Sequence, residues 1–206
     1  YVLGQGGNGE VWQVRGADNT SYALKILNKS TSESLKRFKI EIEALGKISD
    51  IEGIVPLIDQ YDPKLESGET PWFVMPLGKT FDQYKSDKPV LEIIKDFIGL
   101  ANTLNELHLR GYSHRDIKPA NILYINGRLS FSDFGLVKFP EREDITPEKR
   151  DIGAKFTMAP EMRRQAADAD GKLADVYSFI KSLWIAISGE ELGFDGQYNP
   201  DSSLSL

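Results

Sequence analysis

The chain has 206 residues, of which 40% are apolar and 27% are charged, as in an ordinary globular protein. Its net charge of −6 argues against nucleic acid as a partner, and the absence of cysteine excludes disulfides and thiolate metal sites and fits a cytoplasmic location. No uninterrupted apolar run is long enough to cross a bilayer, so we expect no membrane segment in this chain.

A glycine-rich stretch near the start separates two strand patterns. Residues 4–9 read Gly-Gln-Gly-Gly-Asn-Gly, and residues 10–14 alternate polar and apolar side chains, which predicts a strand. A dinucleotide-binding fold would need a helix directly after the glycines. A glycine turn between strands can cover phosphates, because backbone N–H groups approach the oxygens where side chains are absent. Alone, the pattern also fits a flexible hairpin turn.

The next four elements are predicted from periodicity. Residues 21–27 form a strand pattern with one charge, Lys25, which is either a functional residue or an edge lysine with its head in solvent. Residues 54–61 and 72–75 predict two further strands. Between the strand patterns at 21–27 and 54–61, residues 31–48 predict a helix, since apolar residues recur at helical spacing at Leu35, Phe38, Ile42 and Leu45.

Two long helices are predicted in the second half, over residues 90–110 and 172–188. The apolar residues of the first recur at helical spacing and are predicted to face the core. Those of the second surround the helix almost completely, which predicts a central, buried helix. The predicted core positions are Leu91, Ile94, Ile98, Ala101, Leu104, Leu107 and His108 in the first helix and Val176, Phe179, Ile180, Leu183, Trp184 and Ile187 in the second.

A polar loop is predicted between these helices, where residues 112–123 read Tyr-Ser-His-Arg-Asp-Ile-Lys-Pro-Ala-Asn-Ile-Leu. Pro119 has no N–H and disfavours a helix before it, so the segment cannot continue the preceding helix. A loop between apolar anchors can aim several polar groups at one point. The groups in question are Asp116, Lys118 and Asn121.

A hairpin is predicted directly after this loop, turned by Asn126 and Gly127. A hairpin brings its two ends together, so Asp133 should lie near Asp116 and Asn121. Two carboxylates and an amide oxygen suit a hard cation such as Mg²⁺ rather than zinc or copper.

Five stretches of the chain together resemble the eukaryotic-type (Hanks-type) protein kinases of the serine/threonine branch, over residues 4 to about 190. They are the glycine stretch, the Lys25 strand, His-Arg-Asp at 114–116, Asp-Phe-Gly at 133–135 and Ala-Pro-Glu at 159–161. The resemblance implies an α+β, bilobal protein-kinase-like fold. A small antiparallel β-sheet lobe with one helix is expected in residues 1–77, and a larger, mainly helical lobe in residues 78–206. We expect a truncated C-terminus without the family's last helices, so that a missing segment or an additional chain completes the larger lobe.

The resemblance implies a serine/threonine protein kinase that transfers the γ-phosphate of ATP to a protein hydroxyl with Mg²⁺. Lys118, two residues after Asp116, is typical of this branch, and Arg115 disfavours the related small-molecule kinases. Two departures stand against it, because Ala154 replaces the family's usual threonine and Thr157 its usual tyrosine. The alternative is therefore a nucleotide-binding pseudokinase or scaffold with weak or no transfer activity.

The resemblance also implies catalytic roles. Asp116 would accept the hydrogen bond of the attacking hydroxyl, and Lys118 would steady the γ-phosphate. Lys25 would bind the nucleotide phosphates and pair with a glutamate of the following helix, for which Glu41 and Glu43 compete. We expect Glu41, because it lies near the edge of the apolar face, whereas Glu43 points about 160° away from the core residue Leu45.

The binding residues follow from the same resemblance. Asn121 and Asp133 would hold Mg²⁺, and the backbones of Pro76 and Gly78 would bind adenine. The full set of expected nucleotide-binding residues is Gly4, Gly6, Gly9, Val11, Ala23, Lys25, Met75, Pro76, Gly78 and Leu123.

Three further residues take expected roles by resemblance. Asp175 would anchor the backbone of the His-Arg-Asp loop, and His114 would pack against Phe134 rather than act as a base. Thr146 is a candidate phosphorylation site with Arg115 as the receiver of the phosphate, although a threonine before Pro-Glu is also an ordinary helix cap.

Overall fold

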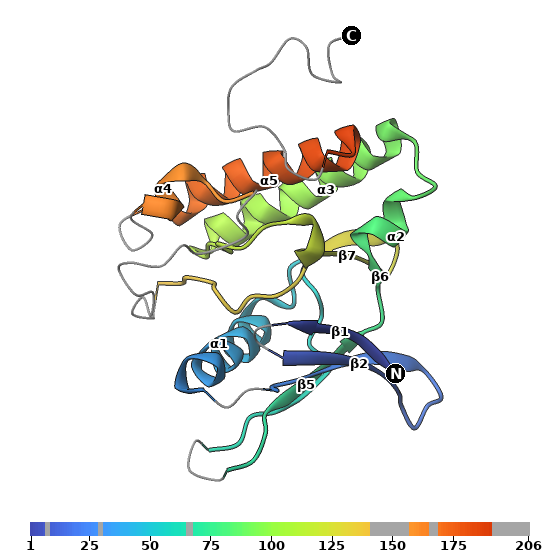
Figure 1. Cartoon of the computed structure of the whole chain (residues 1–206), viewed down its shortest axis with the longest axis vertical. Coiled ribbons are helices and arrows are strands. Elements are labelled where there is room, and N and C mark those ends of the chain that lie inside the picture. Colours follow the sequence, from blue (N-terminus) through green and yellow to red (C-terminus); the bar gives the residue numbers. More distant parts are fainter. Residues whose placement is uncertain (7–8, 29–30, 65–67, 141–156, 165–168, 191–206) are drawn as a thin grey trace.

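The strand patterns of the first half and the helical patterns of the second half fold into two packed parts in the computed structural model (Figure 1). The structure describes residues 1–6, 9–28, 31–64, 68–140, 157–164 and 169–190. The predicted bilobal α+β fold is confirmed. In chain order the elements are β1 Val2–Gly6, β2 Gly9–Arg15, β3 Ser21–Ile26, α1 Ser32–Ile48, β4 Asp59–Tyr61, β5 Trp72–Pro76, β6 Lys79–Thr80, α2 Phe81–Lys85, α3 Val90–Leu109, the 3-10 helix η2 Pro119–Asn121, β7 Ile122–Ile125, β8 Arg128–Phe131, α4 Pro160–Arg164 and α5 Gly171–Ser188.

A five-stranded antiparallel sheet forms most of the first part, in the order β1-β2-β3-β5-β4. The register places Val11 opposite Lys25 and Ala23 opposite Met75. Since alternate residues of a strand share a face, Ala23 and Lys25 point to the same side of β3, where both are buried. The strand thereby carries its one charged residue into the interior.

Helix α1 packs on this sheet through the face that the sequence predicts. Thr31 caps its start by accepting a hydrogen bond from the Ser34 N–H at 3.1 Å. Phe38, on the buried face, packs against Phe73 of β5 with ring centroids 5.5 Å apart.

The strand predicted over residues 54–61 is wrong for its first half, because β4 covers only Asp59–Tyr61. The backbone before it bonds to the other part of the molecule instead: Phe131 N donates to Gly53 O at 2.8 Å, and Val55 N donates to Phe131 O at 3.0 Å. Thr103 of α3 also donates its hydroxyl to Glu52 O at 2.7 Å. The loop after α1 is thus tied to the second part rather than to the sheet.

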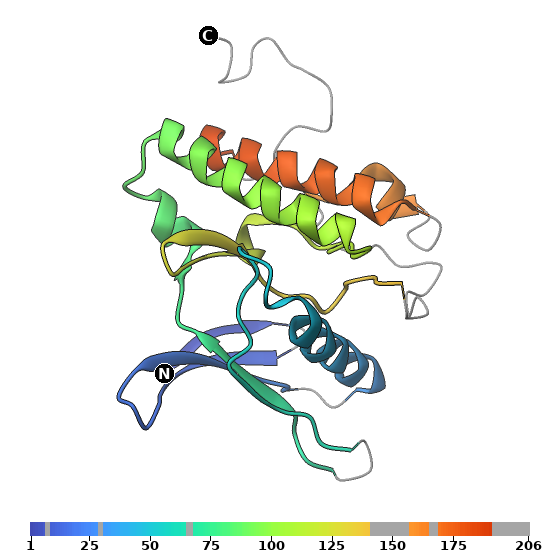
Figure 2. The same cartoon turned by 180° about the vertical axis from the view of Figure 1, so that it is seen from behind.

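Helices α3 and α5 lie side by side in both views of the second part (Figures 1 and 2). Phe97 of α3 and Phe179 of α5 meet there, with ring centroids 5.4 Å apart. Within the described residues no helix has the length and apolar character that a membrane crossing needs.

The predicted core faces of these helices need correction. On α3, Leu91 is 72% and Ile98 59% exposed, and on α5, Val176 and Ile180 are also exposed. Both helices are apolar around more of their circumference than the described elements cover, so periodicity alone could not select the buried side. The apolar residues of α3 that are buried are Ile93, Phe97, Leu100, Leu104 and Leu107.

The predicted hairpin forms as β7 and β8, with Ile122 paired to Phe131 at its open end. Asn126 and Gly127 have φ of 51° and 85°, the left-handed backbone that this sequence tolerates well. The hairpin brings the loop that ends at Asn121 next to the segment that begins at Ser132, whose N–H donates to Asn121 O at 2.9 Å.

Replacing Gly53 by alanine should destabilise the fold through the loop after α1. Gly53 has φ of 84°, and a Cβ there would lie 2.2 Å from Thr103 Oγ1. We expect the free energy of unfolding to fall by about 1–3 kcal/mol. Gly46→Ala is the matched control, because nothing lies within 4 Å of its Cβ position in α1, and it should stabilise by about 0.5–1 kcal/mol. Urea unfolding measures both, and equal effects of the two changes would contradict the role of this loop.

Candidate active site

A cleft of about 770 Å³ is lined by residues of both parts of the molecule. It collects residues from β1, β2, β3, α1, β5 and the segment after it, β6, α2, the loop before β7, β7 and the segment after β8. The predicted site residues that line it are Gly4, Gly9, Val11, Ala23, Lys25, Glu41, Met75, Pro76, Gly78, Asp116, Lys118, Asn121, Leu123 and Asp133.

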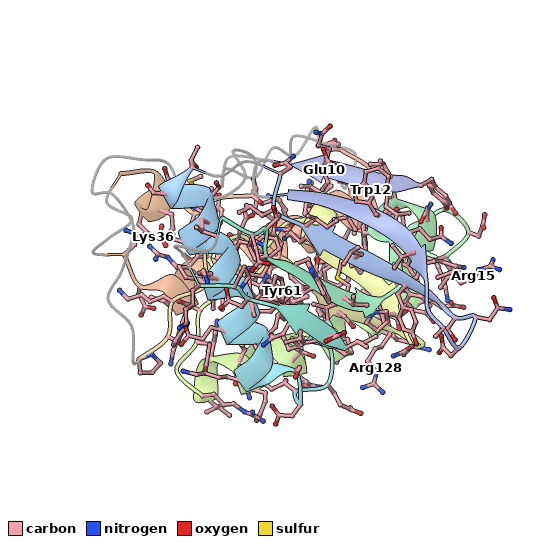
Figure 3. All side chains as sticks on the ribbon, turned by 90° about the horizontal axis from the view of Figure 1, so that it is seen from below. Glu10, Trp12, Arg15, Lys36, Tyr61 and Arg128 are labelled. Carbon is pink, nitrogen blue, oxygen red and sulfur yellow. The ribbon has the colours of Figure 1, made fainter. Side chains whose placement is uncertain are left out.

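The hairpin that carries the glycine stretch is braced on its outer side. Gln5 Nε2 and Trp12 Nε1 donate to the two oxygens of the Glu10 carboxylate, at 2.8 and 3.2 Å. Figure 3 shows Glu10 and Trp12 next to each other at this edge of the sheet. The exposed Gln5 bond connects β1 to β2 across the turn, and the Trp12 bond holds the Glu10 carboxylate from within β2.

A buried ion pair connects three elements at the back of the cleft. Lys25 Nζ lies 2.7 Å from both carboxylate oxygens of Glu41 and 3.2 Å from Asp133 Oδ1. Glu43, the competing glutamate, lies on the exposed side of α1 and pairs with Lys47 at 3.3 Å. Lys25 therefore joins β3 to α1 and to the segment after β8.

The charges of this group depend on one another. Burial works to lower the pKa of Lys25, but the carboxylates of Asp133 and Glu41 raise it above its ordinary value. Burial also acts to raise the pKa of Asp133, but the Lys25 ammonium holds it below the usual value. Burial raises the pKa of Glu41 to about 7, against the opposing effect of Lys25. At neutral pH the site thus holds an ammonium beside an ionised Asp133.

The two oxygens of the buried Asp116 carboxylate are in different environments. Oδ2 accepts hydrogen bonds from Lys118 Nζ at 2.8 Å and from Asn121 Nδ2 at 2.9 Å. Oδ1 is buried and has no hydrogen-bond partner in the structure as described. A buried acceptor without a donor is costly unless a ligand completes it. Asp116 is therefore oriented through one oxygen and left with an acceptor at the other.

Asn121 and Asp133 supply the oxygen atoms that a hard cation would need. The Asn121 amide nitrogen donates to Asp116, both to Oδ2 and to the backbone O, the latter at 2.8 Å. Asn121 Oδ1 accepts no hydrogen bond from a described residue. Asp133 binds Lys25 through Oδ1 only. The oxygen atoms available as metal ligands are therefore one amide oxygen and one carboxylate oxygen, a set that fits Mg²⁺.

The backbone that carries Asp116 is held by a buried carboxylate of α5. Asp175, which is 1% exposed, accepts the backbone N–H groups of His114 and Arg115, each at 2.7 Å. Arg115 has φ of 67°, a conformation that costs a non-glycine residue about 1–3 kcal/mol. The His114 ring packs on Phe134 with centroids 4.5 Å apart. The turn is thus fixed from two sides.

At the other end of the cleft the chain passes between the two parts at Gly78. A Cβ at this position would lie 2.6 Å from Ile125 Cγ1 and 3.2 Å from Tyr124 O. The segment therefore runs so close to β7 that a side chain here would require the Ile125 side chain to shift. Ala23 and Leu123 line the cleft beside it, from β3 and β7.

Two features of the cleft were not anticipated from the sequence. Thr80 and Gln83 line it and form a capping box at the start of α2, for which the Thr-x-x-Gln spacing was a usable signal. Arg37, which pairs with Glu33 at 2.8 Å, also lines it, and no sequence signal distinguished it from other basic residues of α1. Thr146 and Ala154 lie outside the described residues.

Glu41→Gln should destabilise the protein, because it removes a charge from a buried pair and leaves Lys25 with Asp133 alone. We expect the free energy of unfolding to fall by about 1–3 kcal/mol at pH 8, where the Glu41 carboxyl is ionised. Glu43→Gln is the control on the exposed side of α1, where we expect less than about 0.5 kcal/mol. Denaturant titration tests this, and a control that loses as much as Glu41→Gln would refute the assigned partner.

A family profile described as "Protein kinase domain" matches residues 1–201. The L-type lectin-domain containing receptor kinase S.1 of Arabidopsis thaliana is 31% identical over 199 residues, which cover 91% of this chain and 29% of that protein. The serine/threonine-protein kinase AtPK2/AtPK19 of the same plant is 30% identical over 195 residues, 92% of this chain and 40% of that protein. The serine/threonine-protein kinase MPS1 of Saccharomyces cerevisiae is 29% identical over 170 residues, 78% of this chain and 22% of that protein. The chain thus spans less than half the length of these curated relatives, and it belongs to the protein kinase family.

Proposed function

We propose that this chain is a serine/threonine protein kinase domain that transfers the γ-phosphate of ATP to a protein hydroxyl, with Mg²⁺ as the cofactor. The observation that carries the proposal is the asymmetric environment of Asp116. Its Oδ2 is held by Lys118 and Asn121, while its buried Oδ1 has no partner among the described residues. That oxygen is the acceptor that an attacking hydroxyl requires.

In the proposed reaction Asp116 orients the serine or threonine hydroxyl through Oδ1. The hydroxyl oxygen forms a bond to the γ-phosphorus as the bond to the β–γ bridging oxygen breaks, ADP leaves, and the hydroxyl proton passes to Asp116. Lys118, 2.8 Å from Oδ2, lies where its ammonium can neutralise the transferred phosphoryl group. Phosphoryl transfer depends mainly on such positioning and charge neutralisation.

We further propose how the nucleotide is held. Lys25 binds the phosphates, and Glu41 keeps its ammonium in place. Bound Mg²⁺ neutralises phosphate charge, and Asn121 and Asp133 are the residues that would hold it. The glycine stretch covers the phosphates, Val11, Ala23, Met75 and Leu123 enclose the adenine, and the backbone O of Pro76 and N–H of Gly78 bind its edge.

The proposal also includes the expected lobe boundary, substrate, location and completing segment. The lobes divide near residue 77, where the chain passes from β5 to β6. A protein serine or threonine is the substrate. A cytoplasmic location suits a reaction that consumes ATP in a chain without cysteine. A further segment or an additional chain completes the helical lobe beside the exposed residues of α5.

Phosphate transfer from γ-labelled ATP tests the proposal most simply. With Mg²⁺, and with myelin basic protein and the chain itself as acceptors, we expect transfer that Asp116→Asn lowers at least about 100-fold. Asp87→Asn is the control, since Asp87 is an exposed aspartate after α2, and it should transfer at the unchanged rate. Equal rates for Asp116→Asn and the unaltered chain would rule out the assigned role.

The variant Asp133→Asn tests the binding of the cation separately from the binding of the nucleotide. Removing this carboxylate should abolish the dependence of ATP binding on Mg²⁺, because the amide that replaces it carries no negative charge and the site then offers the cation two neutral oxygens. The measurement is the rise in Tm on adding ATP, with Mg²⁺ and with EDTA. We expect Mg²⁺ to increase the rise for the unaltered chain and for Asp59→Asn, an exposed control, but not for Asp133→Asn. An undiminished Mg²⁺ effect in Asp133→Asn would remove the metal assignment.

A further inference from the structure

Few side chains hold β1 to β2 near the glycine turn. β1 is the edge strand of its sheet, so its position depends on its pairing with β2. The register pairs nearest the turn are Gly4–Val11, Gln5–Glu10 and Gly6–Gly9. Two of these three pairs contain glycine, which has no side chain and loses more conformational freedom on ordering than any other residue. Gln5 and Glu10 are therefore the one pair of the three with a side chain on both strands, and such pairs stabilise a sheet.

The Glu10 carboxylate accepts one hydrogen bond from each strand. Gln5 Nε2 of β1 donates to Oε1 at 2.8 Å, and Trp12 Nε1 of β2 donates to Oε2 at 3.2 Å. Glu10 and Trp12 share one face of β2, since alternate residues of a strand point to the same side. Val11, between them, lines the cleft. The indole thus fixes the carboxylate from within β2, and the carboxylate bonds β1.

We propose that Glu10 is a positioning residue for Mg-ATP, an inference that rests on the function proposed above. Its carboxylate holds β1 against β2 from the outer face of the hairpin. The neighbouring register pair, Gly4 of β1 and Val11 of β2, lines the cleft. Holding one pair in register also holds the next, so Glu10 fixes the backbone at the nucleotide without touching the nucleotide itself.

This arrangement predicts a change in ATP affinity rather than in the transfer step. The Asp116 carboxylate is bonded by Lys118 and Asn121, which belong to the loop before β7 and to its 3-10 helix rather than to β1 or β2. Loss of the bond between Gln5 and Glu10 should therefore weaken the binding of Mg-ATP and leave kcat almost unchanged. An exposed cross-strand bond of this kind corresponds to about a threefold change in affinity.

The test is a double-mutant cycle, in which Gln5→Ala is made in the unaltered chain and in a chain that carries Glu10→Ala. The charge lost with Glu10 also acts on ATP, but it cancels because the comparison is made within each chain. Gln13→Ala is the matched control, because Gln13 of β2 donates to Ser21 Oγ of β3 at 3.3 Å and so removes a glutamine bond that does not involve β1. The readouts are the Kd of Mg-ATP, kcat with myelin basic protein, and hydrogen exchange of the amides of residues 2–6 without nucleotide.

We expect Gln5→Ala to raise the Kd of Mg-ATP about threefold and to speed amide exchange in residues 2–6, with kcat within about twofold of the unaltered chain. In the chain that carries Glu10→Ala the same change should alter neither readout, whereas Gln13→Ala should have the same effect in both chains. An unchanged Kd in Gln5→Ala, an equal effect of Gln5→Ala in both chains, or a loss confined to kcat would overturn the proposal. If the unaltered chain binds Mg-ATP but transfers no phosphate, the proposed function fails alone, because Kd and exchange still test Glu10. If it binds no Mg-ATP, both proposals fail.

Discussion

The contact on which the rest of the site depends is the buried ammonium of Lys25, bonded to Glu41 and Asp133 at 2.7 and 3.2 Å. Its three residues come from β3, from α1 and from the segment after β8, so one charge connects the sheet, its helix and the second part of the molecule. Removing one partner from a buried pair leaves a charge that water cannot reach. The positions of these three elements relative to one another therefore depend on the contacts of this one buried ammonium.

The second constraint is the fixed backbone around Asp116. Arg115 and Asp133 both have positive φ, at 67° and 62°, on the two segments that the β7–β8 hairpin brings together. Non-glycine residues keep such conformations only where other contacts hold them. Asp175 supplies these contacts on one side, and Lys25 on the other. The cost of this backbone strain is thereby offset by contacts to two buried charged residues, and the Asp116 carboxylate is oriented through its Oδ2.

Much of this arrangement could be predicted from the sequence, because its determinants are local. Asn126 and Gly127 specify a hairpin by their backbone preferences alone, and that hairpin brings Asn121 and Asp133 together. The sides of α3 and α5 that are buried could not be predicted, since Ile98 and Ile180 are as apolar as their buried neighbours. Nor could the bond between His108 and Asp175, which joins residues 67 positions apart on two helices. Long-range contacts of that kind depend on tertiary packing, which a short sequence pattern does not determine.

We propose that one cleft holds Mg-ATP between Lys25 and the Asp116 loop. A crystal structure of the chain with Mg²⁺ and a non-hydrolysable ATP analogue would test this proposal. We expect a cation bound by Asn121 Oδ1 and Asp133, phosphates at Lys25, and adenine against the backbone of Pro76 and Gly78. A nucleotide bound outside this cleft, or a cation held without either residue, would contradict it.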